Sequence, residues 1–322
     1  MSIALDTIKK LENRLNQRIL GQETVVEKMI TTLLADGNLL LEGLPGLAKT
    51  RAIKSLSKAL ELQLSRIQFT PDLLPSDITG TEIYQPESDE KFVFEKGPIF
   101  ANLILADEIN RAPAKVQAAL LEAMEERQVT VSGKTYPMEP LFFVMATQNP
   151  VEQEGTYPLP EAQLDRFLMK AVMNYPSKNN ERKVMQLVRA EQTNHSKTEE
   201  TPLDAQLIFD ARKEIDAISV SETAERYIVD LVDATRFPGA YTEDLAAWIH
   251  VGVSPRATIA LEKCARITAW RNGRDHVLPD DIRHVAHDIM RHRIMLSYEA
   301  NAKGITTDQV IDEVIKNVAI LA

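Results

Sequence analysis

Residues 38–50 read NLLLEGLPGLAKT, an apolar stretch that runs directly into a glycine-rich loop. The loop follows the phosphate-binding pattern G-x-x-x-x-G-K-[ST], except that Ala48 stands where the pattern has its second glycine. In such loops, backbone N–H groups and a helix start converge on an anion, a lysine adds charge and a hydroxyl holds magnesium. An alanine adds one methyl group and keeps its N–H. The stretch therefore predicts a nucleotide-binding loop, with a glycine-rich turn that binds no ligand as the alternative. The binding residues expected are Gly43, Leu44, Pro45, Gly46, Leu47, Ala48, Lys49 and Thr50.

Two adjacent acids, Asp107 and Glu108, follow the apolar run ANLILA. They fall at the carboxyl end of an expected strand, which is the edge where α/β sheets bind ligands. One carboxylate can hold Mg²⁺ through water, and the next can polarise a water for attack on a phosphoryl group. A solvated strand end or a helix cap is the alternative for this pair alone. Together with the loop, the acids indicate a P-loop ATPase.

A third polar group, Asn149, follows the apolar run that ends in MATQ. An amide at the end of a neighbouring strand can orient water or contact the γ-phosphate. An asparagine before proline is also a common turn former. The position after a strand favours the functional interpretation.

The rest of the chain reads as two domains of different type. Apolar runs separated by helical patterns, as in residues 62–69, 139–148 and 166–174, are typical of buried parallel strands. Residues 79–97 and 128–138 interrupt this alternation and read as β-hairpins. We expect an α/β domain over 1–190, a polar linker over 191–202, and helices over 203–322.

Composition narrows the class of protein. The 322 residues are 44% hydrophobic and 26% charged, with a net charge of −10, which argues against a broadly basic surface for nucleic acid. No apolar run is long enough to span a bilayer, and the N-terminus lacks the features of a signal peptide, so we expect a cytoplasmic location and no membrane insertion. The single cysteine, Cys264, reads as a small buried apolar residue.

Five motifs, taken together, carry a family resemblance. GLPGLAKT at 43–50, LILADEINRA at 103–112, ATQNP at 146–150, LPEAQLDRF at 159–167 and GVSPRA at 252–257 occur in this order. In this set the chain closely resembles the MoxR family of AAA+ ATPases, from about residue 19 to the helical C-terminus. The loop of that family commonly reads GLPGLAKT or GVPGLAKT, so the resemblance accounts for Ala48.

The resemblance implies a fold, an activity and partners. It implies an α/β P-loop AAA+ core, with αβα layers around a parallel sheet, followed by an all-α lid. It implies ATP and Mg²⁺ as cofactors, a homo-oligomeric ring expected to be a hexamer, and protein clients, with a von Willebrand factor A domain protein as one candidate partner. The activity would be a chaperone-like remodelling of protein complexes. A nucleic-acid motor with the same core is the alternative, and the acidic charge disfavours it.

The resemblance also assigns roles to individual residues. The Walker A residues are Lys49 and Thr50, the Walker B residues are Asp107 and Glu108, sensor 1 is Asn149, the arginine finger is Arg166, sensor 2 is Arg256, and the adenine pocket includes Ile19, Leu20, Gly21 and Gln22. Thr50 and Asp107 would be the magnesium residues. The two hairpins resemble the helix-2 insert and the hairpin before sensor 1, which usually face the pore or the substrate.

Two of these assignments have competitors. Arg111 competes with Arg166 as the finger, and a salt bridge from Arg166 to Asp165 or Glu161 is the structural alternative. In RHVAHDIMRHR, residues 283–293, three histidines and Asp288 fall within a few turns of a helix. We interpret His284 and His287 as a solvated face rather than a metal site.

Overall fold

The sheet that organises the molecule has parallel strands in the order β2-β5-β8-β1-β9. The computed structural model describes residues 2–44, 46–47, 49–86, 91–150, 155–193 and 201–320, and within these ranges the sheet has five strands. The strands are β1 (Leu39–Gly43), β2 (Leu64–Gln68), β5 (Leu103–Asp107), β8 (Phe143–Gln148) and β9 (Met169–Met173). Each coincides with an apolar run expected to be a strand, so the α/β core is confirmed.

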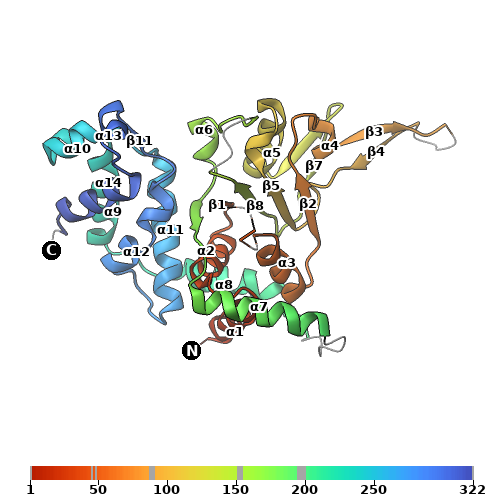
Figure 1. Ribbon diagram of the computed structural model, residues 1–322, viewed down its shortest axis with the longest axis horizontal. Helices are drawn as coiled ribbons and strands as arrows, with labels where there is room; N and C mark the ends of the chain where they lie inside the picture. Colours follow the sequence, from red (N-terminus) through yellow and green to blue (C-terminus); the bar gives the residue numbers. More distant parts are fainter. Residues whose placement is uncertain are drawn as a thin grey trace.

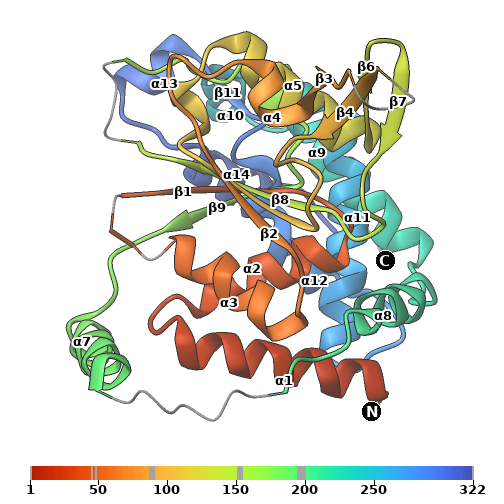
Figure 2. The same ribbon diagram turned by 90° about the vertical axis from the view of Figure 1, so that its right-hand side faces the viewer.

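Helices cover both faces of this sheet. Since successive strand residues point to opposite faces, Leu39 and Leu41 pack among α1, α2 and α3, while Leu40 packs on the side of α5. Figure 2 shows these two layers on either side of the strands. The helices of the core region are α1 (Ile3–Arg18), α2 (Glu23–Leu34), α3 (Lys49–Leu60), α4 (Pro75–Thr79), the 3₁₀ turn η1 (Ile109–Arg111), α5 (Ala114–Glu126), α6 (Glu161–Leu164) and α7 (Lys178–Thr193).

Both expected hairpins are confirmed, and they extend from one side of the core (Figure 1). They are β3 (Gly80–Tyr84) with β4 (Phe92–Lys96), and β6 (Gln128–Val131) with β7 (Lys134–Pro137). Ser132 and Gly133 both have positive φ, as a tight two-residue hairpin turn requires. Phe94 of β4 stacks on Tyr136 of β7, with ring centroids 4.1 Å apart, so the two hairpins support one another.

The C-terminal region is a helical lid, as expected, with one short strand pair added. Its elements are α8 (Gln206–Asp216), α9 (Glu222–Arg236), η2 (Pro238–Ala240), α10 (Glu243–Trp248), β10 (Ile249–Val251), α11 (Pro255–Arg271), α12 (Pro279–Met290), β11 (Met295–Leu296), α13 (Tyr298–Ala302) and α14 (Thr307–Asn317). Strands as short as β10 and β11 leave no periodic pattern in a sequence, which is why only helices were expected here. Among the described residues, no helix has the length and apolar content to cross a membrane.

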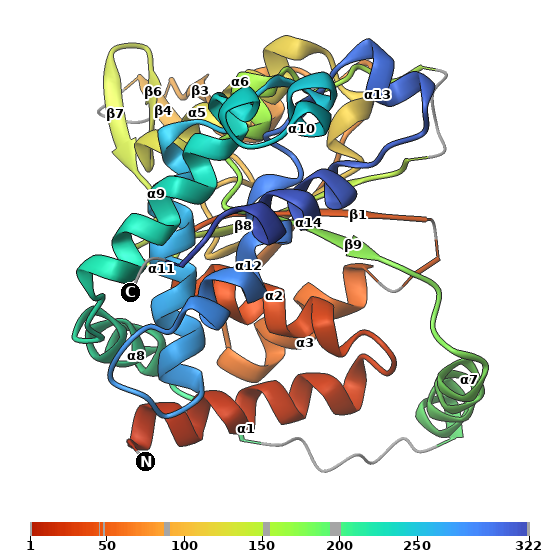
Figure 3. The ribbon, with the colours of Figure 1, turned by 90° about the vertical axis from the view of Figure 1, so that its left-hand side faces the viewer.

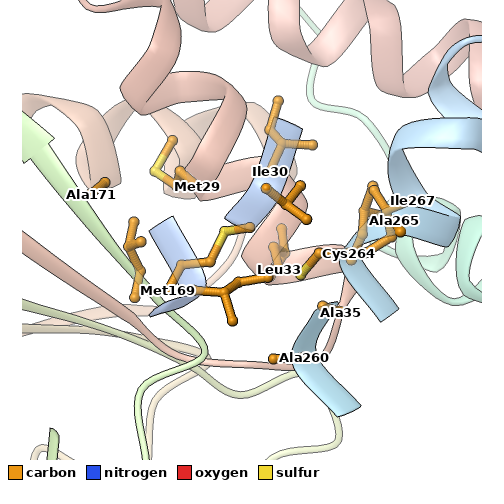
Figure 4. Packing of buried hydrophobic residues seen from close by; sticks show 14 of the residues in the cluster. Met29, Ile30, Leu33, Ala35, Met169, Ala171, Ala260, Cys264, Ala265 and Ile267 are labelled. Carbon is orange, nitrogen blue, oxygen red and sulfur yellow. The ribbon is translucent and has the colours of Figure 1, made fainter. Parts of the chain in front are cut away.

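The lid packs against the core through apolar side chains. Figure 4 shows Ile30 and Leu33 of α2 beside Cys264 and Ile267 of α11. Cys264 is fully buried, as expected, and burial raises the pKa of its thiol to about 12, so it remains a neutral apolar residue. Residues just beyond the expected linker also lie on the core, since the Leu203 N–H donates to the Ala59 carbonyl. The division of the chain at 191–202 stays a prediction, and residues 194–200 lie outside the described ranges.

Ion pairs reinforce the same junction. Glu27 Oε1 on α2 lies 2.7 Å from His284 Nε2 on α12 and 3.3 Å from Arg271 Nη1 on α11. Burial raises the pKa of Glu27, but His284, Lys28 and Arg271 outweigh it and lower the pKa to about 2, from an ordinary 4.5. The Glu27 carboxylate therefore joins the core and the lid in its charged form.

The low pKa of Glu27 predicts a pH-dependent contribution to stability. A carboxyl group whose pKa is lowered by folding stabilises the protein above its unfolded pKa of 4.5, and the contribution is lost as the pH falls toward about 2. At about 1.4 kcal/mol per unit, the full contribution is about 3.5 kcal/mol. Because about 2 kcal/mol of it is lost between pH 5 and pH 3, we expect the free energy of unfolding to fall by about 2 kcal/mol less over this interval in Glu27→Gln than in the native chain. Urea denaturation at several pH values measures this. Glu122→Gln, at an exposed position on α5, is the control and should keep the native slope.

Candidate nucleotide site

The loop predicted to bind phosphate joins β1 to α3, as a nucleotide-binding loop must. Gly46 has φ of +82°, a conformation that favours glycine. Lys49 is the first residue of α3, and its ammonium donates to the Gly43 carbonyl and, at 3.4 Å, to the Gln148 carbonyl. The Lys49 amine therefore lies between the ends of β1 and β8. Pro45 and Ala48 lie outside the described residues, while Leu44, Leu47 and Thr50 complete the loop and its helix start.

The two acids lie at the same edge of the sheet, since β5 ends at Asp107. Glu108 is left-handed, with φ 57° and ψ 50°, and begins the 3₁₀ turn that follows. Thr147 of β8 joins the pair: its hydroxyl donates to Asp107 Oδ1 at 2.7 Å and accepts the Glu108 N–H at 2.9 Å. A non-glycine residue in this conformation needs such support from its surroundings. Thr147 thus fixes both acids relative to β8.

Two residues of β2 contact the acids and were not expected from the sequence. Arg66 forms an ion pair of 2.7 Å with Asp107, and Gln68 donates to Glu108 at 2.9 Å. The parallel register, which pairs Gln68 with Asp107, brings β2 to this position. The sequence shows only that Arg66 and Gln68 are polar residues on either side of Ile67, and nothing local indicates which strand is the neighbour.

Asn149 and the N-terminal segment complete this edge. Asn149 directly follows β8 and is buried.

The N-terminal segment 19–22 contacts the residues that follow β9. The Gln22 amide donates to the Asn174 carbonyl at 2.8 Å. Gly21, with φ of +75°, packs so closely that a Cβ added to it would lie 2.9 Å from Asn180. Beside them is a hollow of about 250 Å³ whose walls include Gly43, Leu44, Met173, Asn174 and Tyr175. The segment 19–22 therefore lies next to a hollow that reaches the loop. Helix α7 follows the lining residues 172–175 in the chain. Figures 2 and 3 show it on the same side of the molecule as the end of the sheet that carries the loop.

The two arginines assigned to catalysis lie elsewhere, and they lie together. Arg166 Nε is 2.8 Å from Glu125 Oε2, and Arg256 forms an ion pair with the other oxygen of the same carboxylate. The salt bridge considered for Arg166 exists, but its acid is Glu125 on α5 rather than Asp165 or Glu161. A helix brings Glu125 close from far away in the sequence, which a search among neighbouring residues could not find.

The position of Arg166 separates it from the loop of its own chain. Arg166 precedes β9, and β9 runs parallel to β1 with Leu39 opposite Met169 and Gly43 opposite Met173. Arg166 thus lies where the strands begin and the loop lies where they end, about 16 Å apart at about 3.3 Å per residue. Arg111, the competing finger, instead lies 3.0 Å from Glu108 of the same chain.

The side chains of the histidine-rich motif, residues 283–293, each contact a different partner. His284 contacts Glu27, His287 contacts Asp312, Asp288 pairs with Lys28, and His292 is buried with its Nε2 at 3.1 Å from the Phe167 carbonyl. Among the described residues, no group of three or more His, Cys, Asp or Glu side chains is arranged to hold a metal ion.

Known proteins resemble this chain along nearly its whole length. The family described as "ATPase family associated with various cellular activities (AAA)" matches residues 38–169, and an AAA lid domain matches 245–314. Chaperone MoxR1 of Mycobacterium tuberculosis is 43% identical over 99% of this chain and 84% of its own length. Protein MoxR of Methylorubrum extorquens is 31% identical over 95% of this chain and 93% of its own. The crystal structure of a candidate ATPase from Cytophaga hutchinsonii is 47% identical, with a TM-score of 0.91 over 99% of this chain and 96% of that one.

Fold and site together define a P-loop ATPase of the AAA+ class with a helical lid. With these relatives, the chain belongs to the MoxR family of AAA+ ATPases, and it is an ATP-hydrolysing enzyme.

Proposed function

We propose that this protein forms a ring, a hexamer, in which ATP hydrolysis drives the remodelling, maturation or activation of protein complexes in the cytoplasm. One observation carries the proposal. The loop and the acids lie at the carboxyl ends of the strands, while Arg166 and Arg256 meet near their amino ends. A site assembled between neighbouring subunits uses both edges. Arg166 and Arg256 would then act together on the ATP held by the adjacent subunit, as a finger and a sensor.

Within one such site, each residue has a distinct task. Lys49 and the loop N–H groups bind the phosphates of ATP. Glu108 accepts a proton from a water whose oxygen bonds to the γ-phosphorus, as the bond to the bridging oxygen breaks and leaves ADP and phosphate. Asn149 orients that water or holds the γ-phosphate. The two arginines from the neighbour stabilise the negative charge that develops on the transferred group.

The residues at the loop suit a magnesium ion held jointly with the nucleotide. Thr50 and Asp107 offer oxygen donors, and Thr147 already fixes the Asp107 carboxylate in orientation. Magnesium sites of this class use one or two protein oxygens with substrate phosphates rather than a cage of side chains. When bound, the ion supplies positive charge to the phosphate oxygens.

Exposed aromatic residues on a hairpin support a role for protein clients. Tyr84 and Phe92 lie at the ends of β3 and β4, more than half exposed, with their ring centroids 5.4 Å apart. Exposed aromatic pairs are typical of surfaces that bind other proteins. The relative from Mycobacterium tuberculosis is named a chaperone, which agrees with such clients. We include a von Willebrand factor A domain protein among the candidate partners on the family resemblance alone.

A nucleic-acid motor remains the alternative function. The net charge of −10 disfavours it, since binding of nucleic acid depends on neutralising phosphates. ATPase assays with and without single-stranded DNA separate the two. A clear stimulation by DNA would favour the motor.

The Glu108→Gln variant tests the proposed function. The change keeps the shape of the side chain and removes the base, so rings should retain ATP and hold clients that the native ring releases. Affinity capture from lysate with ATP, followed by mass spectrometry, should recover proteins that Lys49→Ala rings, impaired in ATP binding, do not recover. Identical proteins captured by both variants, or none that depend on ATP, would count against remodelling of protein clients.

A further inference from the structure

The residues that directly follow the lid helix α12 contact the segment that carries Arg166. Three successive residues, Arg291, His292 and Arg293, all contact the backbone of residues 165–170. Arg291 donates to the Lys170 carbonyl at 2.9 Å, His292 Nε2 lies 3.1 Å from the Phe167 carbonyl, and Arg293 donates to the carbonyls of Asp165, Phe167 and Leu168 at 3.1, 2.7 and 3.2 Å. The histidine-rich motif of the sequence therefore has a structural task in the lid.

Arg293 is the centre of this contact. A guanidinium has five N–H donors, and Arg293 finds five acceptors: the three backbone carbonyls above, the Ile289 carbonyl, and Asp165 Oδ1 at 2.7 Å. Its side chain is 3% exposed. Burial lowers its pKa below the usual value, and Asp165 opposes that shift. Only a planar, fork-shaped cation satisfies so many acceptors at once, so lysine is a poor substitute here.

Asp165 links the two segments that carry Arg166 and Arg256. It directly precedes Arg166, and both of its oxygens accept from the Ser254 hydroxyl at 2.8 Å. Ser254 is the N-cap of α11, two residues before Arg256. The segments that carry Arg166 and Arg256 therefore meet at Asp165, under the guanidinium of Arg293.

We propose that Asp165, Ser254 and Arg293 are positioning residues for ATP hydrolysis, holding Arg166 and Arg256 toward the phosphates bound by the adjacent subunit. The inference rests on the proposed function, because it requires Arg166 to act on a neighbour. None of the three touches ATP. They act by fixing the angle at which the two arginines leave the subunit, and a displacement of about 1 Å at such groups lowers a rate by about a hundredfold.

Arg293→Lys is the direct test, since it keeps the charge but loses the fork. We expect kcat to fall by between about tenfold and a hundredfold, with KM for ATP and the affinity for a fluorescent ATP analogue unchanged, because the loop lies at the opposite edge of the sheet. Arg274→Lys is the matched control. Arg274 also pairs with a buried aspartate, Asp281, but within the lid and away from residues 165–170. Because its contacts lie within the lid, it should keep the native kcat.

Subunit exchange separates positioning from general damage. Rings of Arg293→Lys, mixed with inactive rings of Glu108→Gln, should regain activity, because the Glu108→Gln subunits offer well-placed arginines to the intact sites of their neighbours. No recovery in mixed rings confirmed by native mass spectrometry would overturn the proposal, as would an unchanged kcat in Arg293→Lys. Rings of Arg166→Ala, mixed with Glu108→Gln rings in the same way, provide the comparison. If this mixture recovers activity while the Arg293→Lys mixture does not, the positioning role alone fails; if neither recovers, the action in trans fails with it.

A milder variant keeps the proposal testable if Arg293→Lys does not fold. Ser254→Ala removes one partner of Asp165 and one helix cap, and its kcat should fall in the same direction with KM unchanged. Ser221→Ala, which removes the equivalent cap of α9, is the control and should keep the native kcat. Equal kcat values for the two serine variants would overturn the role of Asp165 and Ser254.

Discussion

Rings carrying Arg166→Ala are expected to bind ATP with nearly normal affinity and to lose hydrolysis by about 10³-fold or more, the effect of removing a finger in trans. Binding survives because the loop and the acids lie at the other edge of the sheet. Hydrolysis falls because the transferred phosphoryl group loses the charge that the Arg166 guanidinium supplies. Fluorescence titration with an ATP analogue and a steady-state ATPase assay measure the two quantities. Arg226→Ala is the control, because Arg226 pairs with Glu222 on the exposed side of α9.

The ATPase activity of mixed rings shows whether Arg166 acts on the ATP of its own subunit or on that of the adjacent subunit. Glu108→Gln subunits have an inactive site and an intact finger, whereas Arg166→Ala subunits have the reverse. Rings that exchange subunits should regain part of their activity wherever a Glu108→Gln subunit lends its finger. Mixed rings without recovery would argue against Arg166 in trans and leave Arg111 as the candidate, although Arg111 lies 3.0 Å from Glu108 of its own chain.

Lys49→Ala should weaken ATP binding by at least about a hundredfold. Hydrogen bonds to charged groups contribute about 1.5–3 kcal/mol each, and the ammonium is the charge that the loop motif directs at the phosphates. In the structure it lies between the Gly43 and Gln148 carbonyls, at the junction of the loop with β8. Equilibrium titration with a fluorescent ATP analogue gives the dissociation constant directly.

The matched control for this loss is Lys58→Ala. Lys58 lies in the last turn of the same helix, exposed, so its removal changes the net charge equally. Its dissociation constant should stay within about twofold of the native value, because an exposed charge beyond about 10 Å is largely screened by salt. Equal affinities in Lys49→Ala and the native ring would refute the assignment of the loop.

The sequence predicted those parts of the site whose residues are neighbours along the chain. The loop, the acids after β5 and Asn149 after β8 each follow a strand, and carboxyl ends of parallel strands meet at one edge, so their proximity could be inferred. The five strands were equally accessible, because a parallel sheet covered on both faces produces continuous apolar runs.

Contacts that depend on register or on distant helices could not be predicted. Arg66 and Gln68 reach the acids only because β2 lies next to β5, and Thr147 joins the acids only because β8 lies on their other side. Glu125 meets Arg166 and Arg256 because the turn after β5 sends α5 back along the sheet. None of these neighbours is encoded in a local pattern, so the partners of the arginines required the structure.

The placement of the arginines one strand length from the loop has a consequence for how the enzyme responds to its own concentration. If Arg166 and Arg256 act on the neighbour, as proposed, each subunit presents one half of a site on one flank and the complementary half on the other, and this head-to-tail contact closes only as a ring. A single subunit then has no complete site. An open row of subunits has one complete site fewer than it has subunits, and only a closed ring has one complete site per subunit. Turnover per chain should therefore rise with protein concentration and level off at closure, so that the amount of protein sets the rate by mass action.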